Sequence, residues 1–363
     1  MASPGSAPHE EPFTATAELA SDAANNGNVR IVFRAQGGPL PAIWSPAFGG
    51  PRPMPMQEDG PKRWKLEVRL PKDACASWAA IPHIRAASPS RSDRLRILVS
   101  TQARVDLGTK MDDQFIVNNA TAPSLYRLIG TDSQRRLTPN IGLIPTPEGD
   151  APNNDGLCAP APTGDEQHIR GHRLVKIGDD EPEALLLDGE VLRRTDAELA
   201  DTGWARSYLD NRGAAARLTD HARPDRFARI MAPLLRNAGC TPQVIVGTSA
   251  AAPTALALAL RMESPQVILL SPAFLDERIR RQLITDAAAR GIRIDVRAGS
   301  EETGGGDPNR SIRLQAETFT TAVREAGGNA AFTQFSGGHD LPAWHFAQLR
   351  ALREAAEQQQ SRK

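Results

Sequence analysis

The sequence predicts an α/β protein in which a doubly wound, mainly parallel sheet follows a small β-sandwich domain. After Asp188, strand-like and helix-like segments alternate, which is typical of a parallel sheet with helices on both faces. In the first part of the chain, short strand-like runs are separated by Pro and Gly, as in a β-sandwich. Residues 145–156 have the composition of a linker. We therefore expect a disordered leader over 1–27, an Ig-like sandwich with its linker over 28–150, and the α/β domain over 160–358.

Composition and charge argue against several classes of function. The chain has 363 residues with 43 basic and 43 acidic side chains, so no basic patch for nucleic acid stands out. Cys75, Cys158 and Cys240 lie far apart, and neither a zinc site nor a disulfide framework is expected. Residues 1–26 lack the basic and apolar regions of a signal peptide. We expect a cytoplasmic protein without a membrane span, whose oligomeric state the sequence leaves open.

The expected sandwich strands are short. Residues 64–70 alternate apolar and charged side chains, the pattern of a strand with one buried face. The tryptophans of this part are expected in its core rather than on a ligand platform; they are Trp44, Trp64 and Trp78. The expected strands cover residues 29–34, 64–70, 77–82 and 95–99.

The α/β domain is expected to contain six strands and six helices. Short β-branched or apolar runs predict the strands, and longer segments rich in Ala, Leu and Arg predict the helices. The strands are expected at 167–177, 183–188, 244–246, 267–270, 292–296 and 330–335, and the helices at 196–209, 224–238, 253–262, 278–290, 311–326 and 342–357.

A serine stands at the turn between one of these strands and the next helix. The segment Gly247-Thr248-Ser249-Ala250-Ala251 follows the strand at 244–246 directly, the context that a nucleophile elbow requires. Small neighbours suit such a sharp turn, although Ala251 replaces the last glycine of the motif. The N–H groups of Ala250 and of Gly189, in the turn after another strand, would stabilise an oxyanion. The alternative is an ordinary turn in which Ser249 caps the helix.

The residues that end the other strands supply the partners of a catalytic serine. Ligands bind at the carboxyl ends of the strands in doubly wound sheets. There Ser249, an acidic residue and His339 occur in the chain order that this kind of fold requires for a triad. Glu302 is the first candidate for the acid, with Glu301 and Asp307 as alternatives. A solvated loop carboxylate, and a histidine that caps the following helix, are the competing interpretations.

Other polar residues have simpler interpretations. Asp340 precedes Leu-Pro at a helix start and is expected to be an N-cap. His168 and His172 are four residues apart, but in a strand or loop, so a metal site is not expected. His345 is expected on the surface of the last helix. No cofactor is implied.

The C-terminal portion, over about residues 170–355, resembles the enterochelin esterase family of the esterase D-like α/β-hydrolases. The matching pieces are Leu185-Leu186-Leu187-Asp188-Gly189, Gly247-Thr248-Ser249, Leu270-Ser271-Pro272-Ala273-Phe274, Ala298-Gly299 with Glu302, and Gly338-His339-Asp340 with Trp344. The resemblance implies an α/β-hydrolase fold behind an N-terminal sandwich. It also implies a cytoplasmic enzyme in which Ser249 and His339 hydrolyse a ferric catecholate trilactone or a related ester.

Substrate contacts are the least specific part of this hypothesis. Arginines near the site would suit an anionic siderophore; the candidates for substrate binding are Asp188, Arg193, Arg194, Arg310 and Trp344. Two other functions remain open. The same serine and histidine could pass the acyl group to an amine or alcohol in a biosynthetic acyltransferase or cyclase. A non-catalytic binding protein could also retain the hydrolase fold.

Overall fold

The computed structural model describes most of the α/β domain and the strands of the sandwich. The described residues are 14–19, 28–37, 41–45, 54–71, 76–81, 141–144, 164–178, 183–193, 196–212, 214–304, 311–339 and 341–361. The strand expected at 95–99 and the linker expected at 145–156 lie outside these residues.

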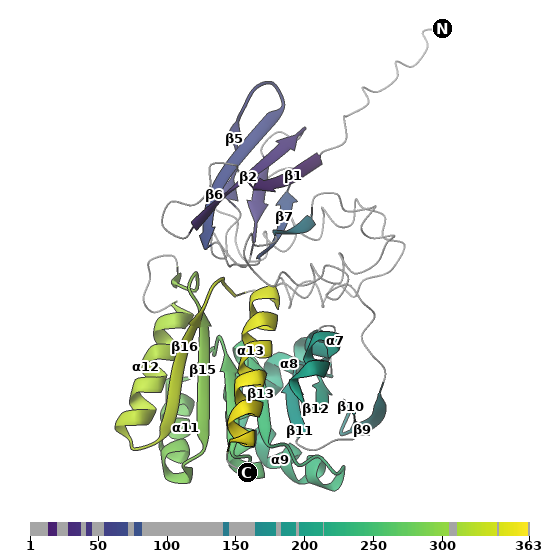
Figure 1. Cartoon of the computed structure of the whole chain (residues 1–363), viewed down its shortest axis with the longest axis vertical. Coiled ribbons are helices and arrows are strands. Elements are labelled where there is room, and N and C mark those ends of the chain that lie inside the picture. Colours follow the sequence, from purple (N-terminus) through teal and green to yellow (C-terminus); the bar gives the residue numbers. More distant parts are fainter. Residues whose placement is uncertain are drawn as a thin grey trace.

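Two four-stranded antiparallel sheets form the N-terminal sandwich (Figure 1). One has the order β1 (Thr14–Leu19), β2 (Asn28–Gln36), β6 (Arg63–Pro71), β5 (Gln57–Glu58), and the other β4 (Met54–Pro55), β3 (Ala42–Trp44), β7 (Ala76–Ile81), β8 (Ile141–Ile144). Apolar side chains from both sheets meet between them, with Phe33 and Trp78 in edge-to-face contact at a centroid distance of 5.2 Å. Trp78 is buried as expected, and Trp64 packs partly buried against the same cluster.

The prediction of a disordered leader over 1–27 is wrong for residues 14–19, which form β1. This strand pairs antiparallel with β2 and places Ala15 opposite Ala35 in the core. Its sequence, Thr-Ala-Thr-Ala-Glu-Leu, alternates polar and small side chains, so the inward face carries little hydrophobic signal. The strand exists because β2 offers a partner, which is a tertiary contribution.

The α/β domain is built on one eight-stranded sheet with the order β16-β15-β14-β13-β11-β12-β10-β9. The strands from β11 to β16 run parallel, whereas β10 is antiparallel to both β12 and β9. The bounds are β9 (Asp165–Ile169), β10 (His172–Ile177), β11 (Glu183–Leu187), β12 (Ala205–Asp210), β13 (Val244–Thr248), β14 (Gln266–Leu270), β15 (Arg293–Gly299) and β16 (Asn329–Phe335).

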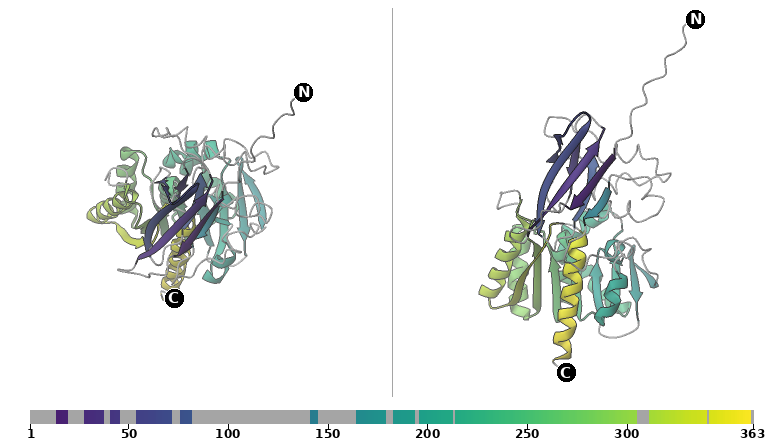
Figure 2. Two further views of the ribbon diagram at one scale, coloured as in Figure 1. Left: turned by 90° about the horizontal axis from the view of Figure 1, so that it is seen from above. Right: turned by 45° about the horizontal axis from the view of Figure 1, so that its top comes forward.

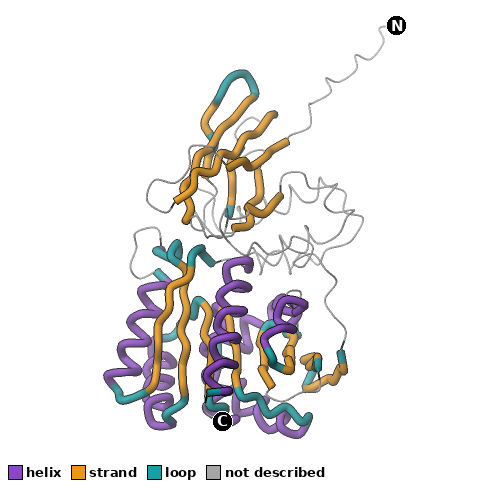
Figure 3. Tube along the Cα trace, viewed as in Figure 1, coloured by secondary structure: helices purple, strands orange, loops and turns teal. Residues whose placement is uncertain are grey.

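Helices cover both faces of this sheet (Figure 3). One face packs against α9 (Pro224–Asn237), α10 (Ala252–Met262), α11 (Glu277–Arg290) and α12 (Ile312–Glu325). The other packs against α13 (Leu341–Gln360), α6 (Gly189–Leu192) and α7 (Asp196–Leu199). Short elements complete the domain: η2 (Ala200–Thr202), α8 (Ala214–His221) and η3 (Ser249–Ala251). The layers confirm the doubly wound, mainly parallel fold.

Two local predictions in this domain are wrong. Residues 196–209, expected as one helix, form α7, η2 and the strand β12, whose six residues are all buried. The polar side chains of this strand do not show the apolar pattern of a buried strand. They can be buried because they have partners outside the strand: Arg206 and Tyr208 both bind Asp196. Residues 167–177, expected as one strand, form the hairpin of β9 and β10, and its turn places Arg170 and Gly171 at positive φ.

The sandwich lies over the carboxyl ends of the parallel strands, and β7 contacts α13 (Figures 1 and 2). In the described part of the chain, no helix has the length and apolar character that crossing a membrane requires.

Candidate active site

Ser249 lies at a strained turn at the carboxyl end of β13. Its φ of 51° lies in the left-handed region, which few non-glycine residues adopt. Gly247 allows the close approach of strand and helix, because a Cβ there would lie 2.6 Å from Ala255 Cβ and 2.7 Å from the Ala251 carbonyl oxygen. Ala251 itself is fully buried, so alanine fits at the last position of the motif. The local geometry is that of a nucleophile elbow.

The loop after β16 carries His339 to this serine. The His339 Nε2 atom lies 2.9 Å from Ser249 Oγ, across 90 residues of sequence. Close packing of backbone allows the loop to reach the site, since a Cβ on Gly299 would lie 2.3 Å from the Gly337 carbonyl oxygen. The Glu301 N–H donates to the same oxygen at 2.9 Å and ties the two strand-end loops together.

Glu302 is the acidic residue that contacts His339. Its Oε1 lies 2.6 Å from His339 Nδ1, and its side chain is buried. Because a carboxylate only accepts, Nδ1–H donates to Glu302 in the neutral imidazole and Nε2 is left to accept the Ser249 hydroxyl hydrogen. Of the two alternatives, Glu301 is exposed and contacts Ser300, and Asp307 lies outside the described residues.

Two residues that sequence reasoning did not assign to catalysis support the carboxylate. Ser271 directly follows β14, donates to Glu302 Oε2 at 2.9 Å and accepts from the Trp344 indole N–H at 2.8 Å. The Gly299 N–H donates to the same Oε2 at 2.7 Å. The position of Ser271 at a strand end was the available signal. Trp344 is 5% exposed and its polar atom is engaged, so the expected substrate contact is not supported.

The turn after β11 faces the serine turn along the sheet. β11 and β13 pair in parallel up to Leu186 and Val246, so the turns that follow them begin at the same level of the sheet. The hydrogen bond from Thr248 Oγ1 to Asp188, at 3.4 Å, agrees with that register. Gly189 is the residue that fits, because a Cβ there would lie 2.6 Å from Asp210 Oδ1. Ala250 and Gly189 are therefore on adjoining turns, as an oxyanion site requires.

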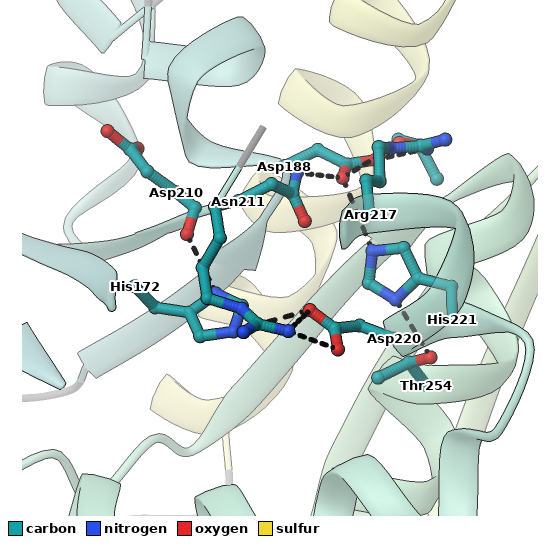
Figure 4. Close-up of polar contacts among 10 residues, drawn as sticks. His172, Asp188, Asp210, Asn211, Arg217, Asp220, His221 and Thr254 are labelled. Atoms are coloured by element: carbon teal, nitrogen blue, oxygen red, sulfur yellow. Dashed lines mark hydrogen bonds and ion pairs between the residues drawn. The ribbon is translucent and has the colours of Figure 1, made fainter. Parts of the chain in front are cut away.

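Asp188 is a buried structural carboxylate rather than a substrate ligand, which corrects the sequence-based assignment. Figure 4 shows its surroundings: Arg217 donates to both oxygens at 2.8 and 2.5 Å, Asn211 donates at 2.7 Å, and His221 Nε2 lies 3.4 Å away. Burial alone would raise the pKa of Asp188, but the charge of Arg217 and hydrogen bonds from His221 and Arg217 hold it far below its usual range.

The remaining candidates fall into three groups. Arg193 is buried and pairs with Asp210 at 3.2 Å, so its predicted substrate contact is not supported. His345, expected on the surface, is fully buried, because α13 lies with one side against the sheet. Arg194, Arg310 and Asp340 lie outside the described residues.

The two histidines with metal-like spacing also have different surroundings. His168 is exposed on β9, whereas His172 is buried and approaches the Asp210 carbonyl at 3.0 Å and Asp220 at 3.4 Å. Among the described residues, no three His, Cys, Asp or Glu side chains gather as metal ligands would.

Comparison with known proteins concerns the fold. No family model matches the sequence, and no curated protein matches it. Several solved structures match it. An enterobactin esterase from Shigella flexneri, crystallised in the presence of 2,3-dihydroxy-N-benzoyl-serine, is 19% identical with a TM-score of 0.60. The ferric enterobactin esterase from Salmonella typhimurium is 18% identical, also with a TM-score of 0.60. Each match covers 93% of this chain and 95% of the other.

The chain has the enterobactin esterase fold. The match extends over the sandwich as well as the α/β domain, because it covers nearly the whole chain. The resemblance drawn from the C-terminal motifs is therefore confirmed for the fold, and the expected N-terminal sandwich is part of it. At this identity the likeness concerns the fold, and the chemistry depends on the side chains.

Proposed function

We propose that the protein is a serine esterase that hydrolyses the ester bonds of a siderophore trilactone, or of a related macrolactone or depsipeptide, through an acyl-enzyme. The observation that carries the proposal is the continuous hydrogen-bonded chain from Ser249 through His339 to Glu302. All three residues lie in the turns or loops that follow strands β13, β15 and β16, at the carboxyl edge of the sheet. This kind of fold binds ligands there.

The proposed reaction has two half-steps. Ser249 Oγ attacks the ester carbonyl while His339 Nε2 takes its proton, and Glu302 stabilises the imidazolium through Nδ1–H. The N–H groups of Ala250 and Gly189 stabilise the oxyanion. Collapse of the intermediate expels the alcohol, which receives the proton from His339. Water then attacks the acyl-enzyme by the same route and releases the acid.

The substrate class rests on the neighbours of this fold. The Shigella flexneri esterase was crystallised in the presence of enterobactin and, separately, of 2,3-dihydroxy-N-benzoyl-serine. These two compounds correspond to a cyclic catecholate ester and a catecholate-serine unit. For this chain, a catecholate trilactone is the first compound to test, with or without ferric iron.

Labelling and product analysis test the proposal. A fluorophosphonate should label the wild-type protein at Ser249, and Ser249→Ala should abolish labelling and lower enterobactin turnover by several orders of magnitude. Wild-type protein that resists labelling would contradict the proposal. Turnover is followed by liquid chromatography with and without an added amine. Acid products in both cases support hydrolysis, whereas a dominant amide product would indicate an acyltransferase.

A further inference from the structure

Ser271 combines complete burial with a strained backbone. It is 0% exposed, and its φ of 47° places a non-glycine residue in the left-handed region. Its backbone N–H donates to the Arg297 carbonyl at 2.6 Å, so the turn is anchored to the neighbouring strand β15. Strain of this kind persists where the surroundings determine the conformation, and it occurs often at functional sites.

The hydrogen bonds around Ser271 have only one possible direction. An indole N–H can only donate, so the Trp344 Nε1–H at 2.8 Å occupies the Ser271 oxygen as an acceptor. A carboxylate can only accept, so the single Ser271 hydroxyl hydrogen points to Glu302 Oε2 at 2.9 Å. Trp344 therefore orients the hydroxyl, and the hydroxyl in turn holds the carboxylate.

The two carboxylate oxygens of Glu302 have different hydrogen-bond partners. Oε2 accepts from Ser271 and from the Gly299 N–H, which leaves Oε1 to His339 at 2.6 Å. Two donors on one oxygen and one on the other fix the rotation of the carboxyl group. The carboxylate is then held in the plane in which it meets the imidazole.

Trp344 also contacts His339, the partner of Glu302. Its ring meets the His339 imidazole edge to face, with centroids 4.7 Å apart and planes at 83°. One side chain, anchored on α13, therefore limits the rotation of the imidazole and, through Ser271, that of the carboxylate. A residue with only a packing role would not need its N–H directed at the hydroxyl that holds the acid.

We propose that Ser271 and Trp344 are positioning residues, which act through Glu302 and His339 to align the base with Ser249. The inference rests on the proposed function, because it concerns the activation of the Ser249 hydroxyl. Neither side chain touches the reacting atoms. Both are expected to affect the activation of Ser249 and therefore kcat, while substrate binding, reflected in KM, stays near the wild-type value.

Two single variants and their combination test this inference. Trp344→Phe keeps a ring against His339 but removes the donor, and Ser271→Ala removes the hydroxyl without adding bulk at the strained position. Each should slow fluorophosphonate labelling and lower kcat by roughly 3- to 30-fold, the range expected for one buried hydrogen bond. The double variant should lose less than the product of the two, because both break one chain.

A second buried tryptophan provides the matched control. Trp204 is 3% exposed and donates its indole N–H to the Leu352 carbonyl of α13 at 2.9 Å, so Trp204→Phe removes the same kind of bond elsewhere on that helix. It should lower thermal stability but leave the labelling rate unchanged. Wild-type labelling rates in both site variants, equal slowing in Trp204→Phe, or fully multiplicative effects in the double variant would overturn the inference. The proposed function would survive those results, since it depends on labelling of the wild type at Ser249; if the wild type is not labelled, both proposals fall.

Discussion

At the scale of single residues, three neighbouring strands are each followed by a non-glycine residue with positive φ. Asp188 follows β11, Ser249 follows β13 and Ser271 follows β14, with φ values of 58°, 51° and 47°. Their proposed roles differ: Asp188 precedes the oxyanion turn, Ser249 is the proposed nucleophile, and Ser271 orients the proposed acid. Left-handed conformations at such residues are costly and cluster at functional sites. Three of the six non-glycine residues with positive φ in the described part of the chain lie at this shared carboxyl edge.

Gly247→Ala tests how the elbow depends on close packing. The added methyl would overlap Ala255 Cβ and the Ala251 carbonyl, both of which belong to the packed core. We expect a loss of about 1–3 kcal/mol in the free energy of unfolding, measured by urea denaturation, and slower labelling of Ser249 because the turn is displaced.

Ala251→Gly is the control for this change, because it restores the glycine of the general motif. Only about 0.5–1 kcal/mol of stability should be lost, from the greater backbone freedom of glycine, and the labelling rate should remain near wild type. Equal labelling defects in both variants would contradict the packing argument.

At the scale of elements, the cap of helix α12 is connected to the loop after β15 that carries Glu302. Ser311 Oγ accepts from the Leu314 N–H at 3.1 Å, which caps the helix, and its hydroxyl donates to the Glu302 carbonyl at 3.1 Å. The Arg313 N–H donates to the same carbonyl at 3.3 Å. The first turn of the helix therefore holds the backbone of the proposed acid.

Ser311→Ala is expected to affect both stability and reactivity. Loss of the cap should lower the free energy of unfolding by about 1 kcal/mol. Loss of the bond to Glu302 should also slow fluorophosphonate labelling, since the carboxylate is less well held. Urea denaturation and labelling kinetics measure the two effects separately.

The neighbouring helix α11 provides the matched control. Its N-cap, Asp276, accepts from the Arg278 and Ile279 N–H groups at 2.8 and 3.2 Å. Asp276→Ala should lose a similar stability of about 1 kcal/mol while labelling continues at the wild-type rate. If the two variants label equally fast, the connection between α12 and the acid has no functional effect.

At the scale of the whole molecule, buried titratable side chains near the sheet make the stability of the fold depend on pH. Burial lowers the pKa of His172, although its hydrogen bond to the Asp210 carbonyl and the charge of Asp220 oppose this effect. The folded protein then binds fewer protons than the unfolded chain below about pH 6.5, the usual pKa of histidine. Stability should therefore fall as the pH drops from that value toward the folded-state pKa.

The carboxylate of Asp188 acts in a different pH range. Its pKa is depressed in the folded state, so its contribution to stability is present above the unfolded value of about 3.9 and is lost only as the pH falls through the folded value. Between pH 7.5 and 5.5 the change in stability is accordingly assigned to His172 rather than to Asp188.

His172→Gln tests that assignment. Urea denaturation of the wild type should show lower stability at pH 5.5 than at pH 7.5, with a slope of at most about 1.4 kcal/mol per pH unit for one proton. The variant is less stable at pH 7.5 but should show a smaller slope. His168→Gln, on the exposed neighbouring strand, should keep the wild-type slope; a parallel loss of slope in both variants would contradict the assignment.

The sequence alone determined the alternation of strands and helices and the serine turn, because both depend on local information. Three local patterns are adjacent in the chain: a β-branched run, a serine among small residues and a helix-forming segment. They predict a strand, a turn and a helix without information on long-range contacts. The glycine-flanked His339 and the chain order of serine, acid and histidine were accessible in the same way. Helices α9 to α13 were predicted almost to their ends for this reason.

Only the tertiary structure decided which side chains meet. The sequence ranked Glu302 first but left Glu301 and Asp307 open as the acid, because the contacts that bury the Glu302 carboxylate against Ser271 and Gly299 form only in the folded chain. The strand β12 and the burial of Asp188 depend on ion pairs with distant residues, and so local polarity misled their assignment. Residues far apart in sequence become neighbours only when parallel strands align their carboxyl ends, and that alignment is set by packing of the whole sheet.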